Sequence, residues 1–388
     1  MHLEALLVYM NAPYSLRMLW RDRSRFLPAL LAVGLSAILI AVQCGLVAGL
    51  VCCTSALIDQ TSADIWVLPL EAPSVHQTSG FPLEWQARLD LQPEVDRSEN
   101  FLTAMGRWRR PGRGSTDLCM IIGVRLDDAS LGAPKVLTPE LRAALAEPGT
   151  VAIDAWELST LGLNGSGYEA GEINGQPVRL VGTLRGFSGF SFVYVYCSHE
   201  TLQMLAPQVV EYPDVATCLV AHCRDPRDVG RVVARLRRDY PDMGVYSSSE
   251  LSTQARFYWL FRSRGGMVMI STMVLAVLVG LSVTSETLYA AVLAQAKEFA
   301  VLEALGIPHR HARGLVLAQS FWIGVGGVIM ALPCIVALAW AGLWIHTTII
   351  LSAPILLITF ALTLGMAIFA GFVSLRPLRS IEPAKLLR

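Results

Sequence analysis

The chain contains little charge and very little lysine. Charged residues make up 16% of its 388 positions, and only Lys135, Lys297 and Lys385 are lysines. None of the three follows a glycine, which excludes the glycine-lysine pair of a Walker A phosphate-binding loop. The low charge and a hydrophobic share of 53% also exclude an ordinary soluble domain, and they indicate a membrane protein.

Other enzyme signatures are also missing. His199 opens "HETLQ", which begins like a zinc-protease helix, but Gln203 stands where the second histidine ligand must be. The segment "GFSGF" at 186–190 lacks the second glycine of a nucleophile elbow. His222 and Cys223 suit a metal by residue type, but no second ligand pair has metal spacing. We therefore expect no catalytic, cofactor-binding or metal site on this chain.

Long uncharged segments are the main feature of the chain. A membrane-crossing helix needs about 20 apolar residues, and the windows 26–58, 265–285 and 314–375 reach that length. The last window has room for two helices, with a hairpin at "IHTTIILSAP", 345–354. The predicted fold class is a membrane protein with four transmembrane α-helices and a large α/β domain between the first and second.

The predicted spans contain no Asp, Glu, Lys or Arg in their interiors. Intramembrane charges mark most ion pathways and proton relays, so their absence argues against an ion-coupled transporter and against a polar conduit through the bilayer. Gln43, Gln319 and Ser320 are polar residues inside the spans, where hydrogen bonds between helices are the ordinary role. The glycine-rich turn at 324–327 would let a neighbouring helix pack closely.

The distribution of basic residues predicts the topology. The flank 1–25, the loop 286–313 and the tail 376–388 together hold 11 basic and 6 acidic residues, whereas the insert 59–264 holds 20 basic and 25 acidic residues. Because basic loops stay in the cytoplasm, both termini and the short loop should be cytoplasmic, with the insert outside. Three arginines on the outer flank of the second span count against this topology: Arg256, Arg262 and Arg264.

The N-terminal flank has two interpretations. Arg17, Arg21 and Arg25 recur every four residues, with Trp20 nearby, as in a helix that lies at the membrane surface. A basic flank that only sets the topology explains the same residues. The following apolar run is longer than the 7 to 15 residues or so of a cleavable signal, so we expect a retained anchor.

The insert contains a βαβ-like pattern towards its end. We expect a strand at 212–223, a helix at 225–240 with Asp225 as its N-cap, and a strand over "MGVYSSSE", 243–250. One face of that helix is apolar: Val229, Val232, Val233 and Leu236.

Short β-prone runs between 149 and 198 predict a second, β-rich subdomain. The glycine-rich connection 163–175 should be a hairpin loop. Cys119, Cys197, Cys218 and Cys223 lie in the insert, where a disulfide is permitted, but Cys218 and Cys223 should point to opposite faces of one strand.

The segment "KEFAVLEALGIP", 297–308, separates two spans and is too charged and too short to cross a membrane. We expect it to continue the second span as a helix that stops at Gly306, with Pro308 beyond. Leu302 and Leu305 lie on an apolar arc with Phe299 and Val301. A segment that is apolar on nearly every side should be covered on more than one side, either by a partner or by the chain's own spans.

These residues resemble the FtsX-like permease family, the membrane subunits of MacB-type ABC systems. The family's cytoplasmic coupling helix has the pattern [RK]-E-[FY]-x-x-L-x-A-[LIM]-G. It is matched in order by Lys297, Glu298, Phe299, Leu302, Ala304, Leu305 and Gly306. The resemblance implies that this helix, with Val301 and Pro308, couples the permease to an ATPase. Within the family the segments 23–46 and 62–69 are most similar to DevC-type members. Ala294 and Gln295 stand where many members have an acidic and a basic residue.

The resemblance implies an exporter subunit in the bacterial inner membrane, with contacts to membrane lipid and none to nucleic acid. It also implies that the outer domain has a porter-like part, which the βαβ-like segment fits, beside the β-rich subdomain. Its partners would be a second copy, an ABC ATPase that holds ATP and magnesium, a periplasmic membrane-fusion adaptor and, through the adaptor, an outer-membrane channel. Similarity to DevC-type members implies a lipid or glycolipid substrate. A receptor-like protein that senses an outside ligand and signals to a cytoplasmic partner is the alternative.

The predicted domains follow from these boundaries. They are the interfacial N-terminal helix (1–25), the first span (26–58), the outer domain (59–264), the second span with its cytoplasmic extension (265–292), the coupling helix and turn (293–313), the third span (314–345), the fourth span (346–375) and the cytoplasmic tail (376–388).

Overall fold

A computed structural model describes most of the chain. The described residues are 23–72, 74–76, 80–110, 116–159, 161–163, 169–187, 189, 192–207, 215–295, 309–344 and 352–375. The chain divides into two compact units. One unit combines Met1–Gly49 with Met267–Arg388, and the other is Leu50–Gly266.

The described part of the first unit consists of long apolar helices. Four helices of the described chain are long and apolar enough to cross a membrane, with windows of mean hydropathy 2.3 to 2.4. They are α2 (Arg23–Asp59), α9 (Arg264–Ala294), α11 (His309–Trp344) and α12 (Ala353–Ser374). Because a helix satisfies its own backbone hydrogen bonds, these uncharged segments suit a lipid environment. The predicted four-span fold class, with an α/β domain between the first and second spans, is confirmed.

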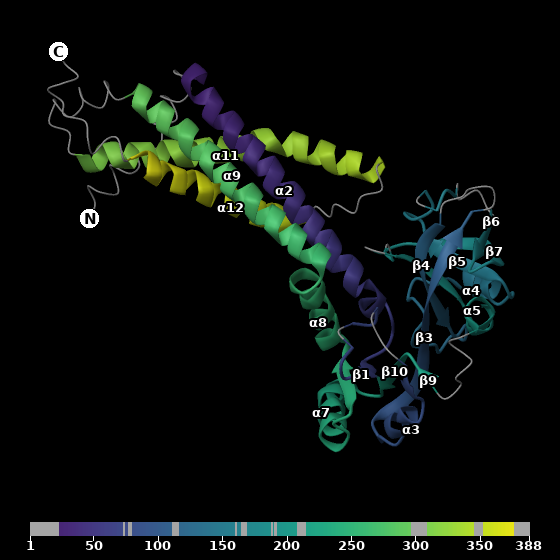
Figure 1. The fold of residues 1–388 in the computed structure, drawn as a ribbon. Coiled ribbons are helices and arrows are strands. Elements are labelled where there is room, and N and C mark those ends of the chain that lie inside the picture. The colour runs from purple at the N-terminus through teal and green to yellow at the C-terminus, as the bar shows by residue number, and fades with distance from the viewer. Residues whose placement is uncertain are drawn as a thin grey trace, which may run out of the picture. The chain divides into compact units, whose positions relative to one another are not determined.

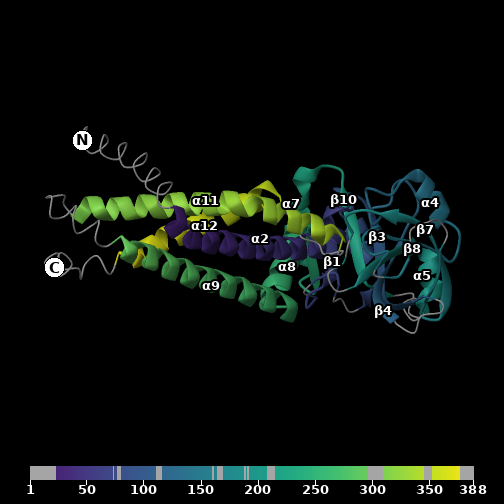
Figure 2. The same cartoon turned by 90° about the horizontal axis from the view of Figure 1, so that it is seen from above.

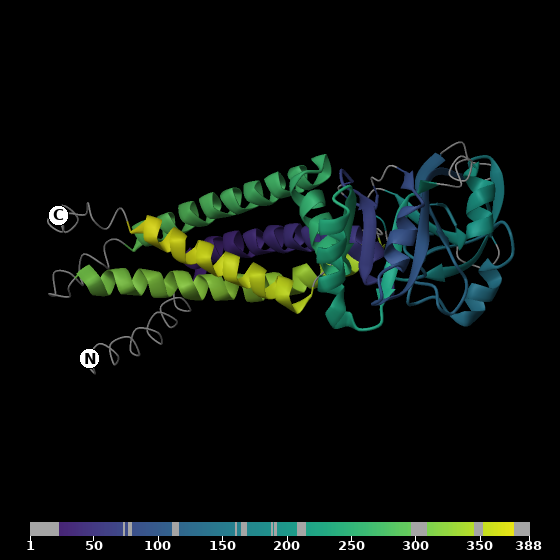
Figure 3. The same cartoon turned by 90° about the horizontal axis from the view of Figure 1, so that it is seen from below.

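Helix α2 lies between α9 and α11 in two of the three views of the helical unit (Figure 2, Figure 3), and Figure 1 shows it beside α9. At its beginning Phe26 and Val33 pack with Leu288 of α9 and Ile323 of α11. Further along, Ile40 and its neighbours pack against α12 and α9. Helix α2 therefore contacts each of the other three candidate spans.

Close backbone approach between α2 and α11 occurs at two glycines. A Cβ atom added to Gly327 would lie 2.6 Å from Cγ1 of Val33 and 3.2 Å from the backbone nitrogen of Gly34. The glycine-rich turn predicted to permit close packing therefore packs on the first span of the same chain.

The second unit is built on a nine-stranded mixed sheet of order β11-β1-β10-β3-β4-β8-β5-β7-β6. Its strands are β1 (Ile65–Pro69), β3 (Val95–Arg109), β4 (Thr116–Val124), β5 (Thr150–Asp154), β6 (Glu169–Ile173), β7 (Gln176–Leu184), β8 (Val193–Ser198), β10 (Cys218–Cys223) and β11 (Met243–Ser247). A small second sheet pairs β2 (Phe81–Pro82) with β9 (Val215–Ala216). Strand β3 joins the two halves of the large sheet, because it pairs with β10 at its start and with β4 at its end.

The predicted βαβ-like unit is present with one strand inserted. Strand β10, helix α7 (Val229–Asp239) and strand β11 follow each other in the chain, but β1 lies between the two strands and is antiparallel to both. Asp225 caps a short 3₁₀ turn, Pro226–Asp228, rather than α7 itself. The strand predicted over "MGVYSSSE" ends at Ser247, because the next residues begin another helix, α8 (Ser248–Phe261).

In the β-rich half, the structure differs from the predicted hairpin loop. Most of the predicted hairpin loop 163–175 that is described is strand β6, and only Asn174 and Gly175 form the turn to β7. Both turn residues have positive φ, 52° and 83°, which asparagine and glycine tolerate best. The helices of this half are α4 (Pro139–Leu145) and α5 (His199–Leu205).

Alternation along β1 separates the cores of the unit. Ile65 and Val67 face α7 and α3 (Trp85–Asp90), whereas Trp66 and Leu68 face the core that contains the end of α2 and helix α8. Cys218 and Cys223 lie in these two different cores, as predicted. All eight cysteines are described and are free thiols, so none forms a disulfide.

Candidate functional site: the coupling segment and the two arms

The coupling segment falls in a part of the chain whose placement is not described. Lys297, Glu298, Phe299, Val301, Leu302, Leu305, Gly306 and Pro308 all lie outside the described residues. The described chain stops at Gln295, just after α9, and resumes at His309 with α11. The segment is thus the connection between two candidate spans, and its coupling role stays a prediction.

Gln295, next to this segment, is a buried residue. Its side chain has no exposed surface, and neither amide atom has a hydrogen-bond partner among the described residues. The family pattern places a charged residue near this position. A buried amide in its place is a different chemistry, and it fits a helix end that packs rather than one that forms ion pairs.

The polar residues inside the spans have structural surroundings. The hydroxyl of Thr272 on α9 lies 3.5 Å from Oε1 of Gln43 on α2, which is a long hydrogen bond between helices. Gln319 is buried. The Ser320 hydroxyl donates to the Val316 carbonyl of its own helix at 2.9 Å, and its contact with α12 is packing against Gly371. Ser320 therefore does not form the hydrogen bond between helices that its sequence position suggested.

Helix α8 is a feature that the sequence analysis missed. Its N-cap Ser247 accepts a hydrogen bond from the backbone N–H of Glu250, whose carboxylate accepts from the backbone N–H of Ser247 in return. This capping box is visible in the sequence as a serine followed three residues later by glutamate, so a signal for it existed. Helix α8 ends at Phe261, and the span helix α9 begins at Arg264. The chain therefore passes almost directly from α8 into the second candidate span.

A polar cluster links α8 to the end of α2. Arg256 of α8 places a guanidinium nitrogen 2.6 Å from Oδ2 of Asp59 and donates from Nε to the Ser55 hydroxyl at 3.0 Å. The same hydroxyl lies 2.8 Å from Oδ2 of Asp59. We call Ser55, Asp59 and Arg256 the α2–α8 joint. Because the arginine is paired here, it does not act as a free charge on the flank of the second span, and its weight against the predicted topology falls.

A half-buried histidine packs against Trp259 of α8. His76 Nε2 is 2.5 Å from the Tyr194 hydroxyl of β8, and its ring meets Trp259 of α8 edge to face at 5.9 Å. Burial lowers the pKa of His76 to about 4 and raises the pKa of Tyr194, so the ring stays neutral and the phenol keeps its proton near neutral pH. The Tyr194 hydroxyl can then donate to His76, and the pair holds α8 against the sheet.

His222 and Cys223 both lie next to Asp64. Nδ1 of His222 lies 2.6 Å from Asp64 Oδ2, which also accepts the backbone N–H of Cys223, while the Cys223 thiol is buried. Among the residues that the structure describes, no group of three or more metal-ligating side chains comes together. His222 instead helps to fix Asp64 next to β1.

Comparison with known protein families gives a match to the C-terminal part of the chain. Residues 270–383 match the model of the FtsX-like permease C-terminal family, so the chain contains this domain over its last three candidate spans. This match agrees with the resemblance that the coupling-segment pattern predicted. No curated protein sequence matches the chain. Similarity to DevC-type members stays a prediction.

Two solved structures with low similarity complete the comparison. The periplasmic region of MacB from Actinobacillus actinomycetemcomitans is 11% identical, with a TM-score of 0.33 over 50% of this chain and 94% of that one. The extracellular domain of the noncanonic ABC-type transporter YknZ from Gram-positive bacteria is 11% identical, with a TM-score of 0.30 over 47% of this chain and 98% of that one. The similarity to FtsX-like permeases rests on the C-terminal match alone.

Proposed function

We propose that the chain is the permease subunit of an ABC exporter whose ATP hydrolysis takes place on separate subunits. The observation that carries this proposal is the FtsX-like match over 270–383, because it includes the segment 297–308 that resembles a coupling helix. The chain itself would be non-catalytic and would hold no cofactor. ATP and magnesium would bind to the partner.

The two arms that lead from the helical unit into the sheet unit suggest how motion is passed on. Helix α9 follows directly on α8, and its other end leads to the coupling segment. The first span, α2, continues into the sheet unit as far as Asp59, where the α2–α8 joint holds it to α8. A shift of the coupling segment would thus reach the sheet unit through α9 and α8, while α2 stays in place.

The uncharged spans support export from the outer side of the membrane. The apolar windows of all four candidate spans contain at most two charged residues each, which does not suit a polar route for substrate. Movement of the outer domain would instead propel substrate, which resemblance suggests is a lipid or glycolipid, into an adaptor and an outer-membrane channel. The working unit would be a homodimer with two ATPase subunits.

The proposed orientation places both termini and the 286–313 loop in the cytoplasm of a bacterial inner membrane. Single cysteines introduced at Gly175 in the outer domain and at Arg310 in the loop test it, after the native exposed cysteines are replaced. A membrane-impermeant maleimide applied to intact spheroplasts should label the first position and not the second. Labelling at Arg310 in sealed cells would refute the orientation.

Isolation of the intact complex tests the function itself. The full chain, purified in mild detergent, should bring down a nucleotide-binding ATPase together with a periplasmic adaptor, identified by mass spectrometry. An ATPase whose hydrolysis rate changes on binding the permease is the expected result. A histidine kinase or another signalling protein in its place would refute the exporter and favour the receptor-like alternative.

A further inference from the structure

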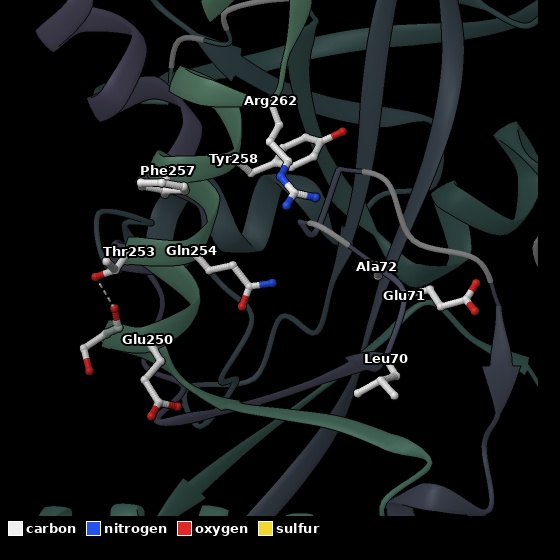
Figure 4. Close-up of a pocket in the computed structure, with 10 residues that line it drawn as sticks. Leu70, Glu71, Ala72, Glu250, Thr253, Gln254, Phe257, Tyr258 and Arg262 are labelled. Atoms are coloured by element: carbon white, nitrogen blue, oxygen red, sulfur yellow. Dashed lines mark hydrogen bonds between the residues drawn. The ribbon is translucent and has the colours of Figure 1, made fainter.

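A cavity lies along one face of α8, within the sheet unit. It has a volume of about 820 Å3 and is bounded by α8 on one side and by the segment Leu70–Ala72, which follows β1, on the other (Figure 4). The joint and the half-buried histidine described above use other faces of α8. The cavity is therefore not explained by the packing of the helix.

The side chains along this wall follow the helical repeat. Glu250, Gln254, Tyr258 and Arg262 are spaced four residues apart and form one stripe that lines the cavity. Figure 4 shows Gln254 and Arg262 extending from α8 on the side of Ala72, whereas Phe257 extends on the other side of the helix. The stripe thus offers hydrogen-bonding groups and ends in a guanidinium group.

Charge in the cavity is concentrated at the Arg262 end. Glu250 is already bound to Arg237 at 2.8 Å, so its charge is compensated. Arg262 is exposed and makes no ion pair with any residue that the structure describes. The remaining acid, Glu71, directs its carboxylate away from α8 (Figure 4). An anionic group would therefore be favoured beside Arg262.

Large apolar side chains lie on the same last turns of α8 as Arg262, which is the C-cap of the helix. Phe257 is 60% exposed and Phe261 52% exposed, and their rings lie 4.7 Å apart. Leu70, across the cavity, is also 60% exposed. Aromatic and basic residues side by side are typical of the boundary between water and the acyl region of a bilayer.

Chain continuity fixes the position of this end of α8. Arg262 lies two residues before Arg264, where the span helix α9 begins, so its Cα atom is within about 8 Å of that helix. Whatever the angle between the two units, the Arg262 end of the cavity stays at the membrane surface. The phosphate of a phospholipid head group is an anion that a membrane surface supplies.

We propose that the cavity between α8 and Leu70–Ala72 binds an anionic phospholipid of the outer leaflet. The phosphate lies at Arg262, the polar head extends along Tyr258 and Gln254, and the acyl chains contact Phe257 and Phe261. The proposal rests on the proposed function only in taking this end of α9 as the outer one. The site would hold α8 at the membrane surface.

Photo-cross-linking of the full chain in vesicles tests the proposal. With p-benzoylphenylalanine in place of Phe257, vesicles of phosphatidylcholine containing phosphatidylglycerol should give a cross-link to phosphatidylglycerol above its share of the lipid. Arg262→Gln should lower that cross-link about fivefold, the effect of one basic residue at an anionic surface. Arg227→Gln, which removes an exposed arginine outside the cavity, should leave it unchanged.

Several results would overturn the proposal. They are equal cross-linking to both lipids, no effect of Arg262→Gln, a cross-link to protein instead of lipid, or loss of the lipid cross-link when free glycerol phosphate is added. The photo-reactive residue at Leu278, an exposed position of α9, should cross-link lipid in every case and confirms insertion. ATPase co-purification measured on Arg262→Gln should be normal. In the protein that keeps Arg262, a missing phosphatidylglycerol cross-link at position 257 with a retained ATPase refutes this site alone. A lost ATPase with a retained cross-link refutes only the coupling.

Discussion

Helices α2 and α9 are nearly equal in hydropathy but differ greatly in how they are packed. Their apolar windows have mean hydropathies of 2.4 and 2.3, yet 44% of the α2 window is buried by protein and only 11% of the α9 window is. The difference lies in the side chains. Helix α2 presents small residues such as Ala37 and Ala41 to its neighbours, while α9 exposes large ones such as Leu275 and Leu278.

The comparison shows that hydropathy and packing are separate properties of a span. Small residues let helices approach closely, whereas a large apolar side chain is equally satisfied by lipid. Among the described residues, protein contacts therefore cover a much larger share of α2 than of α9. We infer that α2 serves as the fixed arm and α9 as the moving arm. The following predictions test this contrast, from the largest expected effect to the smallest.

The strongest test enlarges a residue at the α2 contact. In Gly327→Leu even the Cβ atom would lie 2.6 Å from Val33 of α2, so the bundle should lose 3 kcal/mol or so, at the upper end for overpacking. Gly365→Leu, where a Cβ meets nothing within 4 Å, and Leu275→Phe on the exposed face of α9 should be tolerated. Thermal midpoints in detergent, read by size-exclusion fluorescence, measure all three. Equal falls of the thermal midpoint in the three variants would mean that α2 is not packed more tightly than α9.

The second test loosens α8, which anchors the moving arm. His76 has a pKa of about 4 in the folded chain, against about 6.5 when unfolded, so the unfolded chain binds the extra proton between these values. The stabilisation is complete above pH 6.5 and falls as the pH drops through that window, by about 3 kcal/mol in total. Hydrogen exchange of α8 peptides, corrected for intrinsic rates, should accelerate at pH 5 relative to pH 7.5.

The control for this pH effect is His76→Gln. His199 also has a pKa lowered by burial and contributes in the same direction, so some pH dependence should survive the substitution. The part of the pH dependence that disappears in His76→Gln is the contribution of His76. An α8 exchange profile that is identical in the two proteins at both pH values would contradict the assigned role.

The third test separates the two arms at the α2–α8 joint. Arg256→Met should cost about 1 kcal/mol or less, because the ion pair with Asp59 is partly exposed, at 42% and 41% for the two side chains. The export rate should fall by a larger share than the thermal stability, because the joint holds α8 to the end of α2. Asp59→Asn should give the same phenotype, and the double variant should be no worse. Additive losses in the double variant would show that the two residues act independently.

The smallest effect is expected at the polar contact between the arms inside the membrane. Gln43→Leu removes a 3.5 Å hydrogen bond from Thr272, and such bonds between membrane helices average roughly 0.6 kcal/mol. Export should therefore decrease only modestly. Complete loss of export at a normal membrane level would instead indicate a substrate path along Gln43.

The sequence was most informative where the pattern is local. Long uncharged windows predict the four spans because every span must satisfy its own backbone in lipid. The apolar face of Val232, Val233 and Leu236 predicts α7, because the spacing of apolar residues along a helix is also a local pattern. The insertion of β1 between β10 and β11 joins residues more than 150 positions apart, and no local pattern specifies such a pairing.

Two other misses have different physical causes. The serines at 247–249 directly follow a β-prone run, so the sequence analysis included them in the expected strand. In the structure Ser247 and Glu250 form a capping box that starts α8. The role of Arg256 depends on its contact with Asp59, which lies far away in the sequence. The coupling segment, the most specific pattern in the sequence, lies outside the described residues, so only experiment can test it.

The most direct test of the coupling account compares Leu302→Asp with Lys297→Ala in the full chain. An aspartate at Leu302 would place a charge in a contact that excludes water, at a cost of several kcal/mol, whereas an exposed ion pair at Lys297 contributes about 0 to 1 kcal/mol. Membrane level and thermal stability should stay normal in both variants. We predict that Leu302→Asp loses ATPase co-purification and export, while Lys297→Ala keeps most of both. If Leu302→Asp retained the ATPase and export at the unmodified level, the segment would be an ordinary connector and the coupling role would be wrong.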